Sequence, residues 1–257
     1  MVATKEAQSI RSDISNDILT FIRILENSFD TITSATNICQ ILEDKSDIPV
    51  YGMTPSNNNY WGYETNIRLP ISIIGGLKPI ATQPSMLEFS IKLIADSDKF
   101  KHESFDPLVY LEFNIVTIGY FNGKEMIHSL HLDRHPDSGT SDDPHPKYHF
   151  QFGGRKLEEK INDYGQGMFF DTPRIMHYPM DFILGMDFIL SNYYSDIWIM
   201  IKESNHEYNS LVGKYQDIMI KPYFNSFTNH WSARTPFHDR DWNTQDVCPQ
   251  ITERPKS

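Results

Sequence analysis

The sequence predicts an α+β protein in which an antiparallel meander sheet is flanked by N-terminal and C-terminal helices. Near the start of the chain and again in its last third, apolar residues recur every three or four positions, the spacing of helices with one buried face. Between these regions, apolar and polar residues alternate, the spacing of strands with one buried face. A parallel nucleotide-binding sheet would alternate strands with helices and would carry a glycine-rich phosphate loop. This chain shows neither feature.

Composition narrows the class of protein. A length of 257 residues suits one domain spanning 1–257, and an apolar content of 39% can build a sizeable core. The net charge of -11 disfavours nucleic acid as the main partner, because cationic contacts to phosphates supply most of that affinity. The chain has two cysteines, no signal-like N-terminus and no apolar run near the roughly 20 residues that span a bilayer. We therefore expect a soluble cytoplasmic protein with no membrane partner.

The N-terminal segment, residues 1–45, is predicted to be helical. Its first helix covers residues 7–28, and the apolar positions that share one face are Ile10, Ile14, Ile18, Phe21, Ile22, Leu25 and Phe29. A short second helix is expected over 34–42, with Ser34 as its cap. Residues 49–84 are rich in Pro, Gly and Asn, which predicts loops and one short strand near 69–74.

The core of the sheet is predicted between residues 86 and 153, with about 4–6 strands. Clean alternation predicts strands at Met86–Asp96 and Leu108–Phe121. The side chains expected to be buried beneath the helices are Leu87, Phe89, Ile91, Val109, Leu111, Phe113 and Ile115.

Two further strands follow. Asn122-Gly123 is the sequence of a type I′ turn, so Lys124–His135 should return as a hairpin strand. Lys147–Phe152 should form the next strand. The connecting loop, 134–146, is longer than a hairpin needs. In an enzyme it is expected to act as a lid over a site, and in a scaffold it is expected to be flat, disordered or pressed against a partner chain.

The C-terminal helices are predicted within residues 178–220. Two apolar segments, Met180–Tyr194 and Asp196–Tyr215, are long enough for one helix each. From Lys221 onward the chain is predicted to be irregular and aromatic.

Histidines gather in the predicted sheet. Five of the ten fall between residues 128 and 149, namely His128, His131, His135, His145 and His149. Residues two apart on a strand share a face, so His131 and Asp133 point the same way. If the strands 124–135 and 147–152 are neighbours, His149 can face both, since opposed Cβ atoms lie about 5 Å apart. His128 points to the apolar side and is interpreted as a core histidine with a satisfied hydrogen bond.

Two imidazoles and one carboxylate suit a catalytic zinc with water at the fourth position, or a non-haem iron with open positions. The candidate ligands are His131, Asp133 and His149, and His177 is a further candidate that could replace His149. The hypothesis therefore includes a divalent metal such as Zn or Fe as cofactor. The leading function is a metal-dependent hydrolase or oxygenase.

The sequence His131-Leu-Asp133, followed by a distant histidine, resembles the ligand motif of the 2-oxoglutarate-dependent iron oxygenases. The resemblance covers three residues and implies an iron centre. That family places a substrate-binding Arg shortly after the distal histidine, whereas residues 180–188 contain no Arg. The chain after His177 also has too little predicted strand to complete the barrel of that family.

The same residues allow a metal-free enzyme. His131 or His149 could act as general base, because imidazole titrates near neutral pH. Asp133 or Asp171 would orient it, and an arginine, Arg155 or Arg174, would bind an anionic substrate. The catalytic candidates are thus His131, His149, Asp171 and Arg174.

A non-catalytic alternative also follows from the order of elements. A meander flanked by helices resembles the ubiquitin-conjugating fold, in which the nucleophile is a cysteine. Here Cys39 is too early and Cys248 too late for that role. A protein of this type would be a binding scaffold or a subunit of a larger assembly. The enzyme hypothesis expects a small-molecule partner, and the scaffold hypothesis expects a protein partner.

Overall fold

The computed structural model describes residues 5–29, 50–52, 60–71, 82–100, 106–134, 145–153, 157, 173–232 and 247–250. Within these residues, strands form one antiparallel sheet whose spatial order follows the sequence order from β1 to β7. The strands are β1 (Val50–Gly52), β2 (Tyr60–Pro70), β3 (Gln83–Asp96), β4 (Leu108–Phe121), β5 (Lys124–Arg134), β6 (Tyr148–Phe152) and β7 (Ile175–Met176). The predicted α+β meander is confirmed, and two short edge strands, β1 and β7, make the sheet wider than expected.

Helices lie at both ends of the described chain, and one short helix lies between β3 and β4. They are α1 (Lys5–Phe29), the short α3 (Ser97–Phe100), α5 (Phe182–Tyr193), α6 (Ser195–Ser204), α7 (His206–Tyr215) and α8 (Lys221–Ser232). A turn of π-helix, η1 (Gln216–Ile220), joins α7 to α8. The helix predicted over 7–28 is confirmed as α1, whereas the one predicted over 34–42 falls outside the described residues. No helix in the described part of the chain is both long and apolar enough to cross a membrane.

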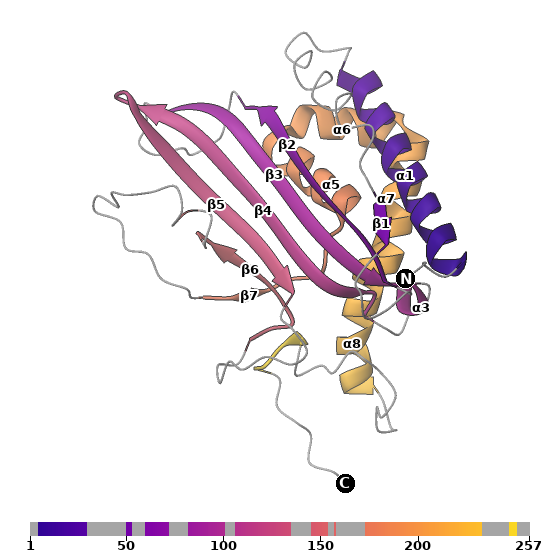
Figure 1. Ribbon diagram of the computed structural model, residues 1–257. Coiled ribbons are helices and arrows are strands. Elements are labelled where there is room, and N and C mark those ends of the chain that lie inside the picture. Colours follow the sequence, from indigo (N-terminus) through magenta and orange to yellow (C-terminus); the bar gives the residue numbers. More distant parts are fainter. Residues whose placement is uncertain are drawn as a thin grey trace.

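The helices gather on one side of the sheet (Figure 1). Gly185 of α5 sits so close to the rings of Phe89 and Phe113 that a Cβ at this position would collide with Phe113. The ring of Phe182 lies 6.1 Å from that of Phe89, and Phe21 of α1 stacks on Tyr208 of α7 at 5.1 Å. We call the helix-covered side of the sheet the core face and the opposite side the outer face.

The strand β2 corrects the prediction of loops over 49–84. Its side chains alternate between buried and exposed from Tyr63 to Leu69, so the period-two pattern was present in the sequence. Gly62, Asn66 and Pro70 concealed it, because these residue types are uncommon in strands. Glycine is required at position 62, because a Cβ there would collide with the main chain of Leu93.

The side chains predicted to be buried in the sheet core are buried, with the exception of Val109. Ile94 pairs with Tyr110 and Ala95 pairs with Leu108, so Val109 is the extra residue of a β-bulge. The bulge buries Leu108 and leaves Val109 half-buried. The predicted hairpin turn is confirmed, since Asn122 and Gly123 both have positive φ, 50° and 77°.

The C-terminal helices differ from the prediction in two ways. The helix expected over 196–215 is broken at Asn205, whose Oδ1 accepts a hydrogen bond from the backbone N–H of Tyr208 and so begins α7. Beyond residue 220 the chain is helical as far as Ser232, so the irregular segment predicted from Lys221 is wrong for α8. Pro222 cannot donate a backbone hydrogen bond, and the π-helical turn directly before it accommodates that loss.

Phe113 tests the packing of the core. Its side chain is fully buried between β3, β5 and α5. Phe113→Ala should lower the free energy of unfolding by about 3–5 kcal/mol, because it removes buried apolar area and leaves a cavity. Urea denaturation measures the change. Tyr120→Ala, at an exposed position of the same strand, should shift stability by no more than about 0.5 kcal/mol. Equal losses in the two variants would contradict the assigned face.

A buried carboxyl group at the start of α5 should make the free energy of unfolding depend on pH. Asp181 caps α5 by accepting a hydrogen bond from the N–H of Leu184 at 2.9 Å. Burial raises the pKa of Asp181 to about 7. The groups that face it from β2, α1 and α7 are Tyr63, Asp17 and Tyr215.

A folded-state pKa above the unfolded-state value means that stability is highest at low pH and is lost as pH rises toward 7. We expect Asp181→Asn, which keeps the accepting oxygen, to gain stability relative to the wild type as the pH rises from about 4 to about 7. The gain should be at most about 1.4 kcal/mol per pH unit. Urea titrations at several pH values measure it, with near-UV circular dichroism to check the native fold. A difference between the two proteins that does not vary with pH would contradict the assignment.

Candidate metal site

A buried ionic cluster aligns the strands that carry the site. Asp106, just before β4, accepts hydrogen bonds from Nε of Arg134 at 3.0 Å and from the hydroxyl of Tyr148 at 2.6 Å. Nζ of Lys147 lies 3.4 Å from the same carboxylate. All four side chains are buried. We call them the Asp106 cluster.

The Asp106 cluster also fixes the β-bulge and the register. Nη1 of Arg134 donates to the carbonyl oxygen of Val109, the bulged residue, at 3.1 Å. Arg134 is the last residue of β5 and Tyr148 the first of β6, and the two form a cross-strand pair. Because both bind Asp106, the pairing of the next residues is set as well, and Asp133 lies opposite His149.

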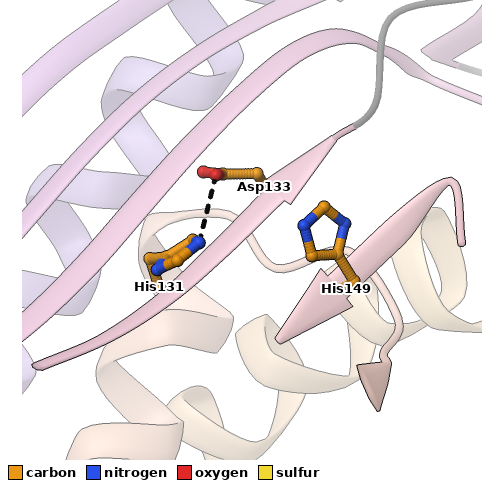
Figure 2. A group of neighbouring side chains, drawn as sticks. All are labelled: His131, Asp133 and His149. Carbon is orange, nitrogen blue, oxygen red and sulfur yellow. Dashed lines mark ion pairs between the residues drawn. The ribbon is translucent and has the colours of Figure 1, made fainter. Parts of the chain in front are cut away.

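His131, Asp133 and His149 lie together on the outer face (Figure 2). Nε2 of His131 is 3.5 Å from Oδ2 of Asp133. One ligand atom of each of the three residues lies within 4.8 Å of the others, so the group could hold a metal ion. The predicted pairing of the two strands and the shared face of the three side chains are therefore confirmed.

The environment of His149 favours the neutral imidazole. The pKa of His149 is lowered to about 4, and burial is the largest cause. The backbone of Pro146 opposes the shift, and the charges of His131, His145 and Arg174 contribute to it. A neutral imidazole is the form that binds metal ions. His149 is 6% exposed, and its buried Nδ1 makes no hydrogen bond within the described part of the chain.

Polar side chains surround the three residues. Asn114 and Gln151 flank His131 on the neighbouring strands, and both are buried. Ser129, two residues before His131 on the same face, is 1% exposed, and its Oγ has no hydrogen-bond partner among the described residues. Buried polar groups are costly unless they are paired, so a polar layer on the face opposite the core is typical of a binding site.

Sequence reasoning missed Ser129, and it placed His145 only within the connecting loop. The spacing of Ser129, His131 and Asp133, each two residues from the next, could have identified Ser129. His145 is a third imidazole, with its ring centroid 5.9 Å from that of His149. It lies outside the strands, so no strand periodicity could place it.

The structure does not bring His177 to this group. Met176 pairs with His149, so the next residue lies on the other face, where the ring of His177 contacts Phe150 at a centroid distance of 4.5 Å. His128 corrects a second prediction, because it is exposed beside Phe152 near the hairpin and is not a core histidine. The helices do not cover that end of the sheet (Figure 1).

Other predicted residues divide between the described and undescribed parts of the chain. Arg174, a catalytic candidate, is half-buried, and its charge acts on the ring of His149. Asp171 and Arg155 lie outside the described residues, as do residues 135–144 of the predicted lid.

No protein-family model, curated protein or solved structure matches this chain. Neither the oxygenase motif nor the ubiquitin-conjugating topology is thus supported by a relative.

The Asp106 cluster predicts a large effect from one substitution. Asp106→Ala should lower the free energy of unfolding by about 3–5 kcal/mol, because it leaves buried cations without their carboxylate. Chemical denaturation measures the loss. Lys92→Ala is the matched control, since it removes an exposed ion pair with Glu64 that is worth at most about 1 kcal/mol. A small loss from Asp106→Ala would show that the cluster does not align the strands.

Proposed function

We propose that this protein is a metal-dependent enzyme, a hydrolase or an oxygenase, that binds one zinc or iron ion through His131, Asp133 and His149. The proposal is supported by one observation above all: ligand atoms of these three residues lie within 4.8 Å of one another on neighbouring strands. Three protein ligands leave coordination positions for water, oxygen or substrate, which separates catalytic from structural sites.

The residues around the ion would have separate tasks. When bound, zinc would activate a water molecule, and iron would supply a redox centre. The chain's own contribution is to hold the two imidazoles and the carboxylate on one rigid sheet, through the register set by the Asp106 cluster. Gln151 and Asn114, on either side of His131, are placed to orient its ring or a bound substrate.

The composition supports a cytoplasmic location and a small-molecule or protein partner. Two cysteines are few for a disulfide-stabilised secreted protein, and the net charge of -11 opposes nucleic acid. These features agree with the enzyme proposal and with the scaffold alternative alike.

The second candidate function is a non-catalytic subunit of a larger assembly. It is favoured by exposed apolar side chains at the edge of the sheet formed by β6 and β7. Phe152 is 58% exposed, and Ile175 and Met176 are 46% and 45% exposed. Apolar side chains gathered at a sheet edge are typical of a protein contact.

Metal binding separates the two functions. The full chain, purified without a histidine tag, should bind one equivalent of Zn²⁺ or Fe²⁺, measured by elemental analysis and calorimetric titration. His131→Ala and His149→Ala should each weaken binding by more than the roughly 10–100-fold that the loss of a supporting residue costs. The melting temperature of the metal-free variants should stay within a few degrees of that of the metal-free wild type, because both side chains lie on the outer face and outside the apolar core.

His206→Ala is the control, since His206 is exposed at the start of α7 and remote from the sheet's outer face. It should retain full metal content. A wild-type chain that binds neither ion, or a His131→Ala variant that binds as well as the wild type, would leave the scaffold function as the better proposal.

A further inference from the structure

Arg174 reaches the site from the edge of the sheet. Ile175 pairs with Phe150 and Met176 with His149 in antiparallel register. One more step of that register places Arg174 beside Gln151. Residues two apart share a face, so Arg174 is on the same outer face as Met176 and His149.

The charge of Arg174 has no protein partner in the described part of the chain. Arg174 is half-buried at the border of the site, and it makes no hydrogen bond or ion pair with a described residue. The chain has 34 acidic residues against 23 basic ones, so carboxylates are abundant. A planar guanidinium binds two oxygens of a carboxylate or phosphate at once.

A second observation, independent of Arg174, also indicates a ligand. Ser129 and His149 are on the same face, both more than nine-tenths buried, and Ser129 Oγ and His149 Nδ1 have no hydrogen-bond partner in the described part of the chain. Gly153, whose N–H bonds to the Ser129 carbonyl, brings no side chain to cover Ser129. A polar ligand lying over this face would supply the missing partners.

We infer that the site binds a small molecule with an oxyanion group, a carboxylate or a phosphate, which Arg174 holds beside His131, Asp133 and His149. The inference rests on the proposed metal site. A divalent ion there would add two positive charges near Arg174, and Asp133 is the one carboxylate among the three ligands. An anionic ligand balances that excess of positive charge. It also places the rest of the molecule next to the ion and to the hydroxyl of Ser129.

The test uses the full chain loaded with Co²⁺, whose visible absorption changes when a ligand enters its coordination shell. Inorganic phosphate and acetate serve as minimal probes of the two anion classes, and isothermal titration calorimetry measures their affinity. Arg174→Ala should weaken binding of the preferred anion roughly 10–100-fold, the effect of losing charge-assisted hydrogen bonds. Arg174→Lys should recover part of that affinity, because lysine keeps the positive charge but cannot form the bidentate hydrogen bonds of a guanidinium.

Metal affinity is the readout that keeps this inference apart from the proposed function. Arg174→Ala should bind Co²⁺ at least as tightly as the wild type, because a neighbouring cation has been removed. Arg68→Ala is the matched control. Arg68 is exposed and paired with Glu88 at 3.0 Å on the outer face, so its loss should change neither affinity.

Failure has two distinct forms. If the wild type does not bind Co²⁺, the metal site itself is refuted. If Co²⁺ binds and Arg174→Ala binds phosphate and acetate as the wild type does, or the wild type binds neither anion, only the oxyanion inference is overturned.

Discussion

The site depends on one buried carboxylate on the opposite side of the sheet. Asp106 holds Arg134 and Tyr148, which end β5 and begin β6. Side chains alternate along a strand, so fixing these two on the core face fixes their neighbours, Asp133 and His149, on the outer face. A slip of one residue would turn Asp133 into the core. The ionic cluster is costly to bury, and its value lies in permitting one register in which the candidate ligands meet.

The two faces of the sheet thus have different roles, since the core face stabilises the fold and the outer face carries the candidate binding site. The core face is apolar and is sealed by α5, whose Gly185 allows the helix to approach Phe89 and Phe113 closely. The outer face near β5 and β6 is also buried but polar, and it contributes little to hydrophobic stability. Ser129 Oγ and His149 Nδ1 are buried without hydrogen-bond partners among the described residues. Burying them in this way lowers the stability of the fold, and folding alone does not explain why such atoms are present. Such costs are commonly retained where a ligand compensates for them.

Local periodicity explains which parts were predictable. Alternation over β3 to β5 and the Asn122-Gly123 turn predicted the meander, the faces and the pairing that unites the three candidate ligands. Features set by distant contacts were missed. The bulge at Val109 depends on Arg134, which follows it by 25 residues. The face of His177 depends on β7, a two-residue strand too short to show any period. Tertiary pairing decides both, and no local pattern encodes it.

The origin of the ligands bears on the kind of chemistry the site can support. His131, Asp133 and His149 come from two adjacent strands, so all three approach from the sheet. A structural metal joins segments that would otherwise separate, whereas these strands are already joined by backbone hydrogen bonds and by the Asp106 cluster. An ion is therefore not needed to hold β5 and β6 together. An ion held by these three residues would be bound from the sheet alone, which would leave its other side for a substrate, and Arg174 lies at the edge of the sheet next to the site. A site in which the fold is complete before the metal binds is suited to catalysis more than to stabilisation.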